Sequence, residues 1–509
     1  MKTSGSAALR YHVATKYHPE TIGQLPAADY DAQPVPFKQY HTERAVELIP
    51  YLPHELFPDA GDLADSAGDP DRDLARLSRT LYFTYGATAR QVWPGGHQIF
   101  RAAPSAGGLY PVEVYLVTQG VEGVPDGFHD YSVPNHQLVP VFDGQFIDEL
   151  AELTYGAFDP VDTRAVVLLS GLFRRSTWRY HERAYRRILL DAGHVYGNLA
   201  QIAREEGFEA LPVSSFDDGG VNGTFFLEEE HVQLVVPLLR PALAPTSLAW
   251  RRPSSIATTE QEPAAPEQGG DPEWEFLRYQ NASHLDRRAE AISRRRLSEQ
   301  TAPTPVSGVP EVSLEAKFEA PENLPKVILE RRSTREFSGE GLSVEQLSEL
   351  LHAGYDAARA QLSGESTVPR LQVPELLATH VVIRDIDGVT PGSYRLDPVS
   401  MVLRCEKAED LRTEVYAFAL GQDLARDAAA VIVHSAELES AVTDYGERAY
   451  RALHIDAGVV GQFINLAAVQ AGIGVSGIGG FFDDQVNATL GLPDESAILY
   501  ITVLGASVP

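Results

Sequence analysis

Residues 180–193 read YHERAYRRILLDAG, and residues 445–458 read YGERAYRALHIDAG. Nine of the fourteen positions are identical and none is shifted. Such a phrase can recur by chance in unrelated helices, or it can be the best-preserved part of a duplicated domain. The order of the predicted elements around the two phrases separates these explanations.

The same predicted elements surround both phrases. Each phrase follows an apolar strand-like run and leads into a helical stretch, a Phe-Asp-Asp turn (residues 216–218 and 482–484) and another apolar strand. Constant order at nearly constant spacing indicates tandem duplication. Residues 241–272 are rich in Pro, Ala, Ser, Glu and Gly without periodicity, which predicts a flexible linker. We therefore divide the chain into an N-terminal segment (1–50), copy one (51–245), a linker with a short helix (246–325) and copy two (326–509).

Each copy has the pattern of an α+β domain. Short β-branched runs alternate with longer stretches of helical spacing, which predicts a mixed sheet covered by helices. A chain of 509 residues is also too long for one ordinary core. Two such domains joined by a linker would form an intrachain pseudo-dimer.

Composition excludes several classes of partner and site. The net charge of −29 repels phosphate backbones and anionic lipids, so we expect neither nucleic acid nor membrane as a partner. Cys405 is the only cysteine, which excludes an intrachain disulfide and fits a reducing cytoplasm. We find no signal-peptide pattern and no apolar run of membrane-spanning length, and the histidines form no metal pattern. We expect a cytoplasmic protein.

The segment Gly472–Gly477 spells G-x-G-x-x-G, the dinucleotide-binding pattern. That pattern is meaningful when it follows a strand and opens a helix, whereas here it follows a predicted helix. The high glycine content, which continues through Gly479 and Gly480, would let the backbone approach a flat ligand. A plain turn is the alternative.

A cationic segment opens copy two. Residues 331–337 read RRSTREF, and guanidinium groups beside hydroxyls suit a phosphate. The alternative is a solvated helix start. The matching region of copy one carries only Arg90.

A tight turn precedes the first strand of copy one. Residues 104–108 read PSAGG, and the Ser105 hydroxyl could face the edge of a ring. Copy two has no such glycines or serine at this place. An ordinary turn before a strand is the alternative.

Taken in order, these stretches resemble the nitroreductase-like flavoprotein superfamily, and more closely the SagB-type dehydrogenases, which are azoline oxidases of thiazole/oxazole-modified peptide pathways. The resemblance covers nearly the whole chain. The segments that carry it are residues 11–19 (YHVATKYHP), 33–40 (QPVPFKQY), 101–115 (RAAPSAGGLYPVEVY), 173–194 (FRRSTWRYHERAYRRILLDAGH), 331–337 (RRSTREF) and 472–492 (GIGVSGIGGFFDDQVNATLGL).

The resemblance implies one FMN at the interface of the pseudo-dimer. Copy two would supply the phosphate grip and the glycine segment, and copy one the Pro-Ser turn. The implied cofactor-binding residues are Arg331, Arg332, Ser333 and Arg335, then Gly477, Ile478, Gly479 and Gly480, and finally Pro104, Ser105, Ala106 and Gly107. The reciprocal site would lack both halves, so we expect one flavin site.

The resemblance also implies a catalytic pair at the start of the repeated phrase. Azoline oxidases have a Lys-Tyr pair where this chain has Arg179 and Tyr180. A guanidinium is not a base near neutral pH, so Tyr180 would be the base and Arg179 its electrostatic partner. The alternative is that most of the phrase serves helix packing and surface pairing.

We therefore expect an FMN-dependent dehydrogenase or oxidase that converts azolines to azoles in a ribosomal peptide pathway. Its partners would be the modified precursor peptide and the cyclodehydratase subunits of that pathway. Two alternatives remain: an NAD(P)H-dependent flavin reductase or nitroreductase, and a flavin-free scaffold subunit of a peptide-modifying complex.

Overall fold

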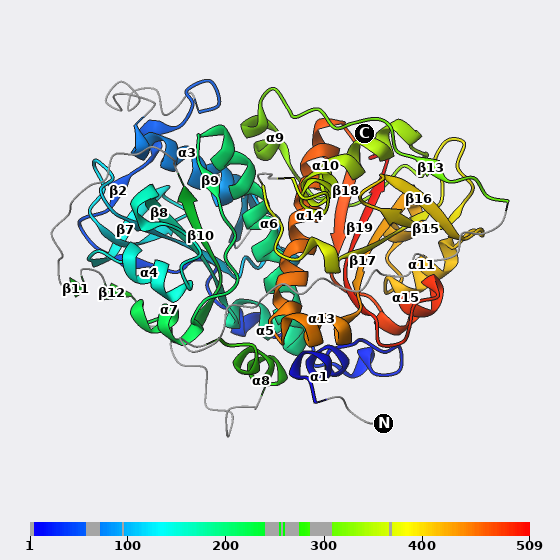
Figure 1. Ribbon diagram of the computed structural model, residues 1–509, viewed down its shortest axis with the longest axis horizontal. Helices are drawn as coiled ribbons and strands as arrows, with labels where there is room; N and C mark the ends of the chain where they lie inside the picture. The colour runs from blue at the N-terminus through cyan, green and yellow to red at the C-terminus, as the bar shows by residue number, and fades with distance from the viewer. Residues whose placement is uncertain are drawn as a thin grey trace. The chain divides into compact units, whose positions relative to one another are not determined.

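The computed structural model describes residues 5–57, 72–93, 96–239, 254–255, 258–259, 274–285, 308–365 and 369–508 (Figure 1). Most of the predicted linker therefore lies outside the described residues. The chain divides into two compact units, one of which combines segments from the two ends of the chain. One unit comprises Asp29–Ala291 and contains copy one. The other comprises Ile292–Pro509 with copy two, together with Met1–Ala28 from the other end of the chain.

The copy-one unit is built on a sheet with strand order β11-β7-β6-β5-β8-β10-β9, in which β2 also pairs with β7. The connections between β5, β6 and β7 are short, whereas two helices separate β8 from β9. The strands are β2 (Val46–Glu47), β5 (Val112–Thr118), β6 (Gly127–Ser132), β7 (Gln137–Asp143), β8 (Thr163–Leu172), β9 (Glu209–Ala210), β10 (Glu230–Leu239) and β11 (Ser254–Ser255). A separate hairpin is formed by β3 (Ala87–Trp93) and β4 (Gly96–Arg101).

The copy-two unit repeats this order as β13-β16-β15-β14-β17-β19-β18. Its strands are β13 (Val312–Ser313), β14 (Ala378–Ile383), β15 (Gly392–Asp397), β16 (Val402–Lys407), β17 (Ala430–Ala436), β18 (Gly474–Ile478) and β19 (Ala497–Gly505). The strands β16-β15-β14-β17-β19-β18 match β7-β6-β5-β8-β10-β9 one for one. The predicted duplication and α+β class are therefore confirmed.

The predicted mixed strand direction is wrong. Every ladder between the named strands of these two sheets is antiparallel within the described residues. After β8 the long helix α6 (Ala184–Glu205) carries the chain back along the sheet to β9. The chain then reverses direction through α7 (Asp218–Thr224) before it enters β10. β10 therefore runs opposite to both β8 and β9.

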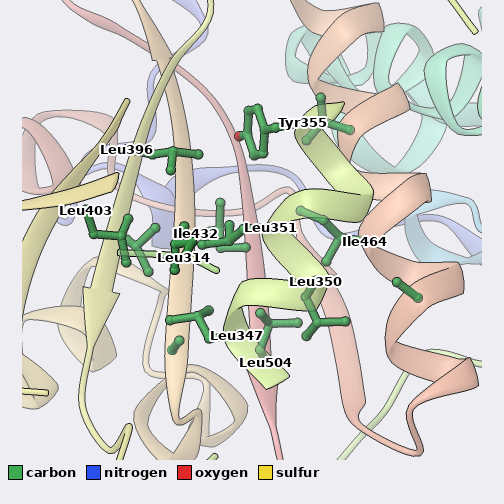
Figure 2. Packing of buried hydrophobic residues seen from close by; sticks show 14 of the residues in the cluster. Leu314, Leu347, Leu350, Leu351, Tyr355, Leu396, Leu403, Ile432, Ile464 and Leu504 are labelled. Atoms are coloured by element: carbon green, nitrogen blue, oxygen red, sulfur yellow. The ribbon is translucent and has the colours of Figure 1, made fainter. Parts of the chain in front are cut away.

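The repeated phrase opens the central helix of each unit. These helices are α6 (Ala184–Glu205) and α14 (Ala449–Gln470), each of 22 residues and buried along nearly all of its length. α14 packs beside α10 (Val344–Leu362), which begins with a capping box between Ser343 and Gln346. Leu350 and Leu351 of α10 lie among core side chains from α14 and from the strands of the sheet (Figure 2). Each phrase is therefore preserved as part of a core.

By length and composition, α14 could cross a membrane: it has a mean hydropathy of 1.4 over an 18-residue window. The expectation that no apolar run reaches membrane-spanning length therefore fails for this helix. However, 94% of the window is buried inside the structure, as in the core helix of a globular domain.

A short helix precedes each central helix and ends at the first tyrosine of the phrase. α5 (Arg174–Tyr180) ends at Tyr180, and α13 (Leu438–Tyr445) ends at Tyr445. The next residue has a positive φ in both copies, 48° at His181 and 74° at Gly446. Glycine adopts this region without strain, whereas histidine does not. The turn that orients each tyrosine is therefore a shared feature of the duplicated scaffold.

The glutamate of each phrase binds the start of a helix from a distant part of the chain. Glu447 accepts hydrogen bonds from the backbone N–H groups of Ala7 (2.9 Å) and Ala8 (2.7 Å), which open α1 (Ala7–Ala14). Glu182 accepts the equivalent bonds from Glu275 (2.9 Å) and Phe276 (3.0 Å), which open α8 (Glu275–Ala282). A carboxylate at this place satisfies two backbone donors that the helix leaves unpaired.

The helices α1 and α8 are themselves copies of each other. Both have eight residues, and both carry Leu-Arg-Tyr at the third to fifth positions. Tyr11 of α1 lies 5.8 Å from the ring of Tyr450, and Tyr279 of α8 lies 5.9 Å from Tyr185, the equivalent phrase residue. The helix that precedes copy one in the chain therefore packs in the copy-two unit, and the helix that precedes copy two packs in the copy-one unit.

Removing either capping carboxylate should loosen the helix that it holds. We expect Glu447→Ala to accelerate amide hydrogen exchange in α1, and Glu182→Ala to accelerate it in α8, because each lost pair of charge-assisted bonds costs about 1–3 kcal/mol. Hydrogen exchange followed by mass spectrometry measures both helices in one experiment. Glu319→Ala, at an exposed position, is the control. Unchanged exchange in both helices would contradict the assigned caps.

Candidate functional site

The PSAGG turn of copy one is bound to the central helix by Asp191. The Ser105 hydroxyl donates to Asp191 Oδ2 (2.5 Å) and accepts from the N–H of Tyr110 (2.8 Å). The N–H of Ala106 donates to Asp191 Oδ1 (3.2 Å). The Ser105 hydroxyl, which we expect to lie near the edge of a ring, is engaged with Asp191 of the helix and with the N–H of Tyr110. Pro104 and Ser105 therefore shape the backbone that follows them.

Asp191 was missed in the sequence analysis, although it lies in the repeated Asp-Ala-Gly of the phrase. Its equivalent, Asp456, accepts hydrogen bonds from the N–H groups of Gln372 (3.0 Å) and Val373 (2.7 Å), which precede the first strand of copy two. Burial raises the pKa of Asp191 to about 7 and that of Asp456 to about 7, in each case against the effect of these hydrogen bonds. The preserved aspartate thus has the same structural role twice.

The glycines of the turn permit a close approach by Tyr180. Gly107 and Gly108 form part of a short 3-10 turn (η5, Ala106–Gly108) with φ of 65° and 66°. A Cβ at Gly107 would overlap the Tyr180 hydroxyl and would lie 3.1 Å from Nη1 of Arg179. The structure therefore brings the predicted turn and the predicted catalytic pair together within the copy-one unit.

Tyr180 is half-buried, and its hydroxyl makes no hydrogen bond with any residue that the structure describes. Two guanidinium groups lie near its ring: that of Arg179 is 5.4 Å from the ring centroid and that of Arg187 is 3.4 Å from it. A cation near the face of an aromatic ring is attracted by the electron-rich π system of that ring. The sequence gives one indication that Arg187 differs in role between the copies: copy two has Ala452 at the equivalent position.

The equivalent tyrosine of copy two is differently placed. Tyr445 is buried, and its hydroxyl donates to Glu375 (2.7 Å), which lies in the 3-10 turn η8 (Pro374–Leu376) before β14. Each tyrosine therefore faces the turn before the first strand of its own copy. Only in copy one does that turn offer glycine in place of a carboxylate.

The cationic segment of copy two follows α9 (Leu324–Glu330). Arg331 is buried, whereas Arg332 and Arg335 are exposed and Ser333 is half-buried. Nη1 of Arg332 donates to the carbonyl oxygens of Leu329 (3.0 Å) and Arg331 (2.5 Å). The side chain of Arg335 forms no ion pair within the described part of the chain. The exposed guanidinium of Arg335 is thus the group that is best placed to meet an anion.

The cationic segment is attached to the glycine segment by Thr334. The N–H of Thr334 donates to the carbonyl of Val475 (2.9 Å), and the N–H of Val475 donates to the Thr334 hydroxyl (2.9 Å). The glycine segment begins on β18 with Gly477 and Ile478 and continues past the end of the strand with Gly479 and Gly480. Each residue of a strand advances the chain by about 3.3 Å. Gly477 is exposed, and a Cβ there would overlap the Tyr500 hydroxyl. The cationic segment is therefore hydrogen-bonded to the strand on which the glycine segment begins.

The residues present fit an FMN phosphate. Exposed guanidinium groups and the Ser333 hydroxyl are the donors that a phosphate prefers. The adjoining backbone at Gly477–Gly480 carries no bulky side chain except the buried Ile478. No group of three or more His, Cys, Asp or Glu side chains that could hold a metal ion occurs among the described residues.

Comparison with known proteins identifies the family. The nitroreductase family model matches residues 70–238 and 328–506, one match for each copy. The chain belongs to the nitroreductase family. Members of this family are typically FMN-dependent oxidoreductases, and the two matches confirm that the family domain occurs twice.

Three relatives show how far the similarity extends. A solved nitroreductase-like structure from Anabaena variabilis is 34% identical, with a TM-score of 0.81, and the match covers 99% of this chain and all of that one. A nitroreductase-like protein of Methanocaldococcus jannaschii is 30% identical over 176 residues, which is 35% of this chain and 88% of the relative. The trifolitoxin-processing protein TfxB of Rhizobium leguminosarum bv. trifolii is 24% identical over 164 residues, 29% of this chain and 42% of the relative.

The buried aspartate of copy one should make stability depend on pH. Because burial raises the pKa of Asp191 from 3.8 to about 7, the folded state holds a proton that the unfolded chain loses. The free energy of unfolding should therefore decrease from about pH 4 to pH 7, by roughly 1.4 kcal/mol per unit of pKa shift. In Asp191→Asn, the amide oxygen can still accept from Ala106, and the amide NH2 group can donate to the Ser105 oxygen, but the titrating carboxyl group and its contribution are removed. Urea unfolding at several pH values should show a shallower decrease for the variant, and identical slopes would contradict the raised pKa.

Proposed function

We propose that this nitroreductase-family protein is an FMN-dependent dehydrogenase or oxidase that converts azoline rings of a modified peptide to azoles. The observation that carries the proposal is the contrast between the two equivalent tyrosines. Tyr180 presents a half-buried hydroxyl beside Gly107, whereas Tyr445 is buried and bound to Glu375. The sequence similarity to a trifolitoxin-processing protein supports a peptide as the substrate.

We propose that the chain binds one FMN through motifs from both copies. Arg331, Arg332, Ser333 and Arg335 would hold the phosphate, and Gly477–Gly480 with the turn at Pro104–Gly107 would hold the remainder of the cofactor. When bound, FMN supplies an acceptor for the hydride that leaves the ring carbon β to the carbonyl. The support is that each copy retains one set of motifs and lacks the other.

In this proposal Tyr180 removes the proton α to the carbonyl of the azoline. A general base must come within hydrogen-bond distance of that proton, and the half-buried Tyr180 has a hydroxyl without a hydrogen-bond partner among the described residues. Arg179, which is also half-buried, would stabilise negative charge that develops beside the phenol. The precursor peptide and the cyclodehydratase subunits of the pathway remain the proposed partners, and the cytoplasm the proposed location.

The phosphate grip predicts how flavin affinity responds to substitution. Arg335→Ala and Arg331→Ala should each weaken FMN binding at least about tenfold, because each removes charge-assisted bonds worth about 1.5–3 kcal/mol. Fluorescence titration of the apoprotein with FMN measures affinity and stoichiometry together, and we expect one FMN per chain. Arg335→Ala is the cleaner variant because Arg331 is buried.

Arg90→Ala is the matched control, because Arg90 is exposed in the corresponding region of copy one. Arg101 is unsuitable as a control, since its guanidinium is buried among the rings of Phe37, Tyr85 and Tyr110. An equal loss of affinity in Arg90→Ala would assign the phosphate to copy one. Two FMN per chain would contradict the single site.

The two tyrosines test the proposed reaction directly. Tyr180→Phe should slow single-turnover flavin reduction by the cognate peptide about 10²–10⁴-fold, the usual cost of removing a general base, while FMN stays bound. Tyr445→Phe should keep both the rate and the flavin. It should nevertheless lose thermal stability, because the hydrogen bond to Glu375 disappears.

The outcomes of this experiment separate the alternatives. Equal and small effects of the two substitutions would exclude Tyr180 as the base, and a large effect at Tyr445 alone would assign the reaction to copy two. Rapid flavin reduction by NAD(P)H and none by the peptide would favour a flavin reductase or nitroreductase. A purified protein without a flavin absorbance band, even after incubation with FMN, would favour the scaffold subunit.

A further inference from the structure

We infer that Arg187 is a positioning residue that holds the Tyr180 ring in place for the proton transfer. The Arg187 guanidinium lies against the face of the Tyr180 ring, and Gly107 of the turn lies against its hydroxyl. Together they would hold the phenol in a fixed arrangement. The inference rests on the proposed function for the role of Tyr180, but the arrangement itself can be tested without any reaction.

The stacking of Arg187 on Tyr180 is close and desolvated. The guanidinium carbon lies 3.4 Å from the ring centroid, well within the distance of about 6 Å at which a cation and an aromatic ring attract each other. Arg187 is 6% exposed. A buried cation–π pair is stronger than an exposed one, and the planar guanidinium also restricts the tilt of the ring. Arg179, at 5.4 Å and half-buried, restricts the ring less.

Asp191 holds the turn that meets the Tyr180 hydroxyl. Asp191 follows Arg187 by one turn of α6, and its attraction to the Arg187 guanidinium offsets part of the cost of its burial. The same carboxylate accepts hydrogen bonds from Ser105 and Ala106, which immediately precede Gly107. Gly107 in turn meets the Tyr180 hydroxyl. Arg187 therefore holds the face of the Tyr180 ring, and Asp191 of the same helix holds the turn that meets the hydroxyl.

Copy two shows that the scaffold does not itself require an arginine here. Ala452 occupies the position of Arg187, yet Asp456 still holds the turn before β14 through Gln372 and Val373. Tyr445 is fixed instead by its hydrogen bond to Glu375. A hydroxyl that donates to a carboxylate is held by its oxygen atom, whereas the Tyr180 ring is held by its face. Arg187 thus fixes the phenol by its ring and leaves its hydroxyl without a hydrogen-bond partner among the described residues.

The test combines three variants with a readout that is independent of activity. Arg187→Met keeps much of the side-chain length without the charge, and Arg187→Lys keeps the charge. Arg451→Lys is a control at a buried phrase arginine of copy two, and it should leave the Tyr180 resonance unchanged. The protein is labelled with 3-fluorotyrosine, and its Tyr180 and Tyr445 fluorine resonances are assigned from Tyr180→Phe and Tyr445→Phe. In Arg187→Met the Tyr180 resonance should move toward the position of a solvent-exposed tyrosine. Arg187→Lys should reverse part of that shift, and Tyr445 should not respond to either change at residue 187.

The same variants are then compared by single-turnover flavin reduction with the cognate peptide. Arg187→Met should lower the limiting rate about tenfold to hundredfold, as expected for a misplaced reacting group, with half-saturation by peptide and bound FMN unchanged. Arg187→Lys should recover at least half of this loss on a logarithmic scale. A Tyr180 resonance that is unchanged in Arg187→Met would overturn the inference whatever the reaction proves to be. A shifted resonance in a protein that the peptide does not reduce would support the positioning of Tyr180 and refute only the proposed reaction.

Discussion

Two buried aspartates determine how each copy of this protein is built. Asp191 and Asp456 lie on the central helices α6 and α14. Each accepts hydrogen bonds from the turn that leads into the first long strand of its copy. A buried carboxylate is costly unless it is hydrogen-bonded, so the helix and the turn must keep their relative positions. This constraint explains why Asp-Ala-Gly is the part of the repeat that ends both phrases without change.

On this common scaffold the two copies have diverged where chemistry would take place. Copy one has Gly107 in the turn and Arg187 on the helix, and Tyr180 lies between them with an unengaged hydroxyl as far as the described residues show. Copy two has Glu375 in the turn, which binds Tyr445, and it alone has the cationic segment after α9. Equivalent positions therefore carry different functions, although the backbone that presents them is the same.

The repeat predicted the fold well because it is a long-range pattern: the offset between the phrases also relates the strands and helices on both sides of them. Strand direction was missed because it depends on the reversal through α7, which short β-branched runs do not encode. The predicted linker helix and N-terminal segment were recognised, but not their equivalence. The helices α1 and α8 share little more than the triplet Leu-Arg-Tyr, and the equivalent contacts of their first residues with Glu447 and Glu182 arise from tertiary structure. In the site, glycine spacing indicated the turn, whereas Asp191 and Arg187 act through packing that sequence spacing does not reveal.

The exchange of α1 and α8 gives a physical reason for the duplication to persist. Each compact unit contains a helix that lies next to the other copy in the chain, and each helix is capped by a carboxylate of the unit it joins. If one copy were lost together with the helix that precedes it in the chain, the remaining copy would lose the helix packed on it, and its capping glutamate would lose two donors. Selection on stability therefore acts on both copies even where only one retains a given functional motif. This dependence allows Tyr445 to be hydrogen-bonded to its turn while the Tyr180 hydroxyl has no hydrogen-bond partner among the described residues.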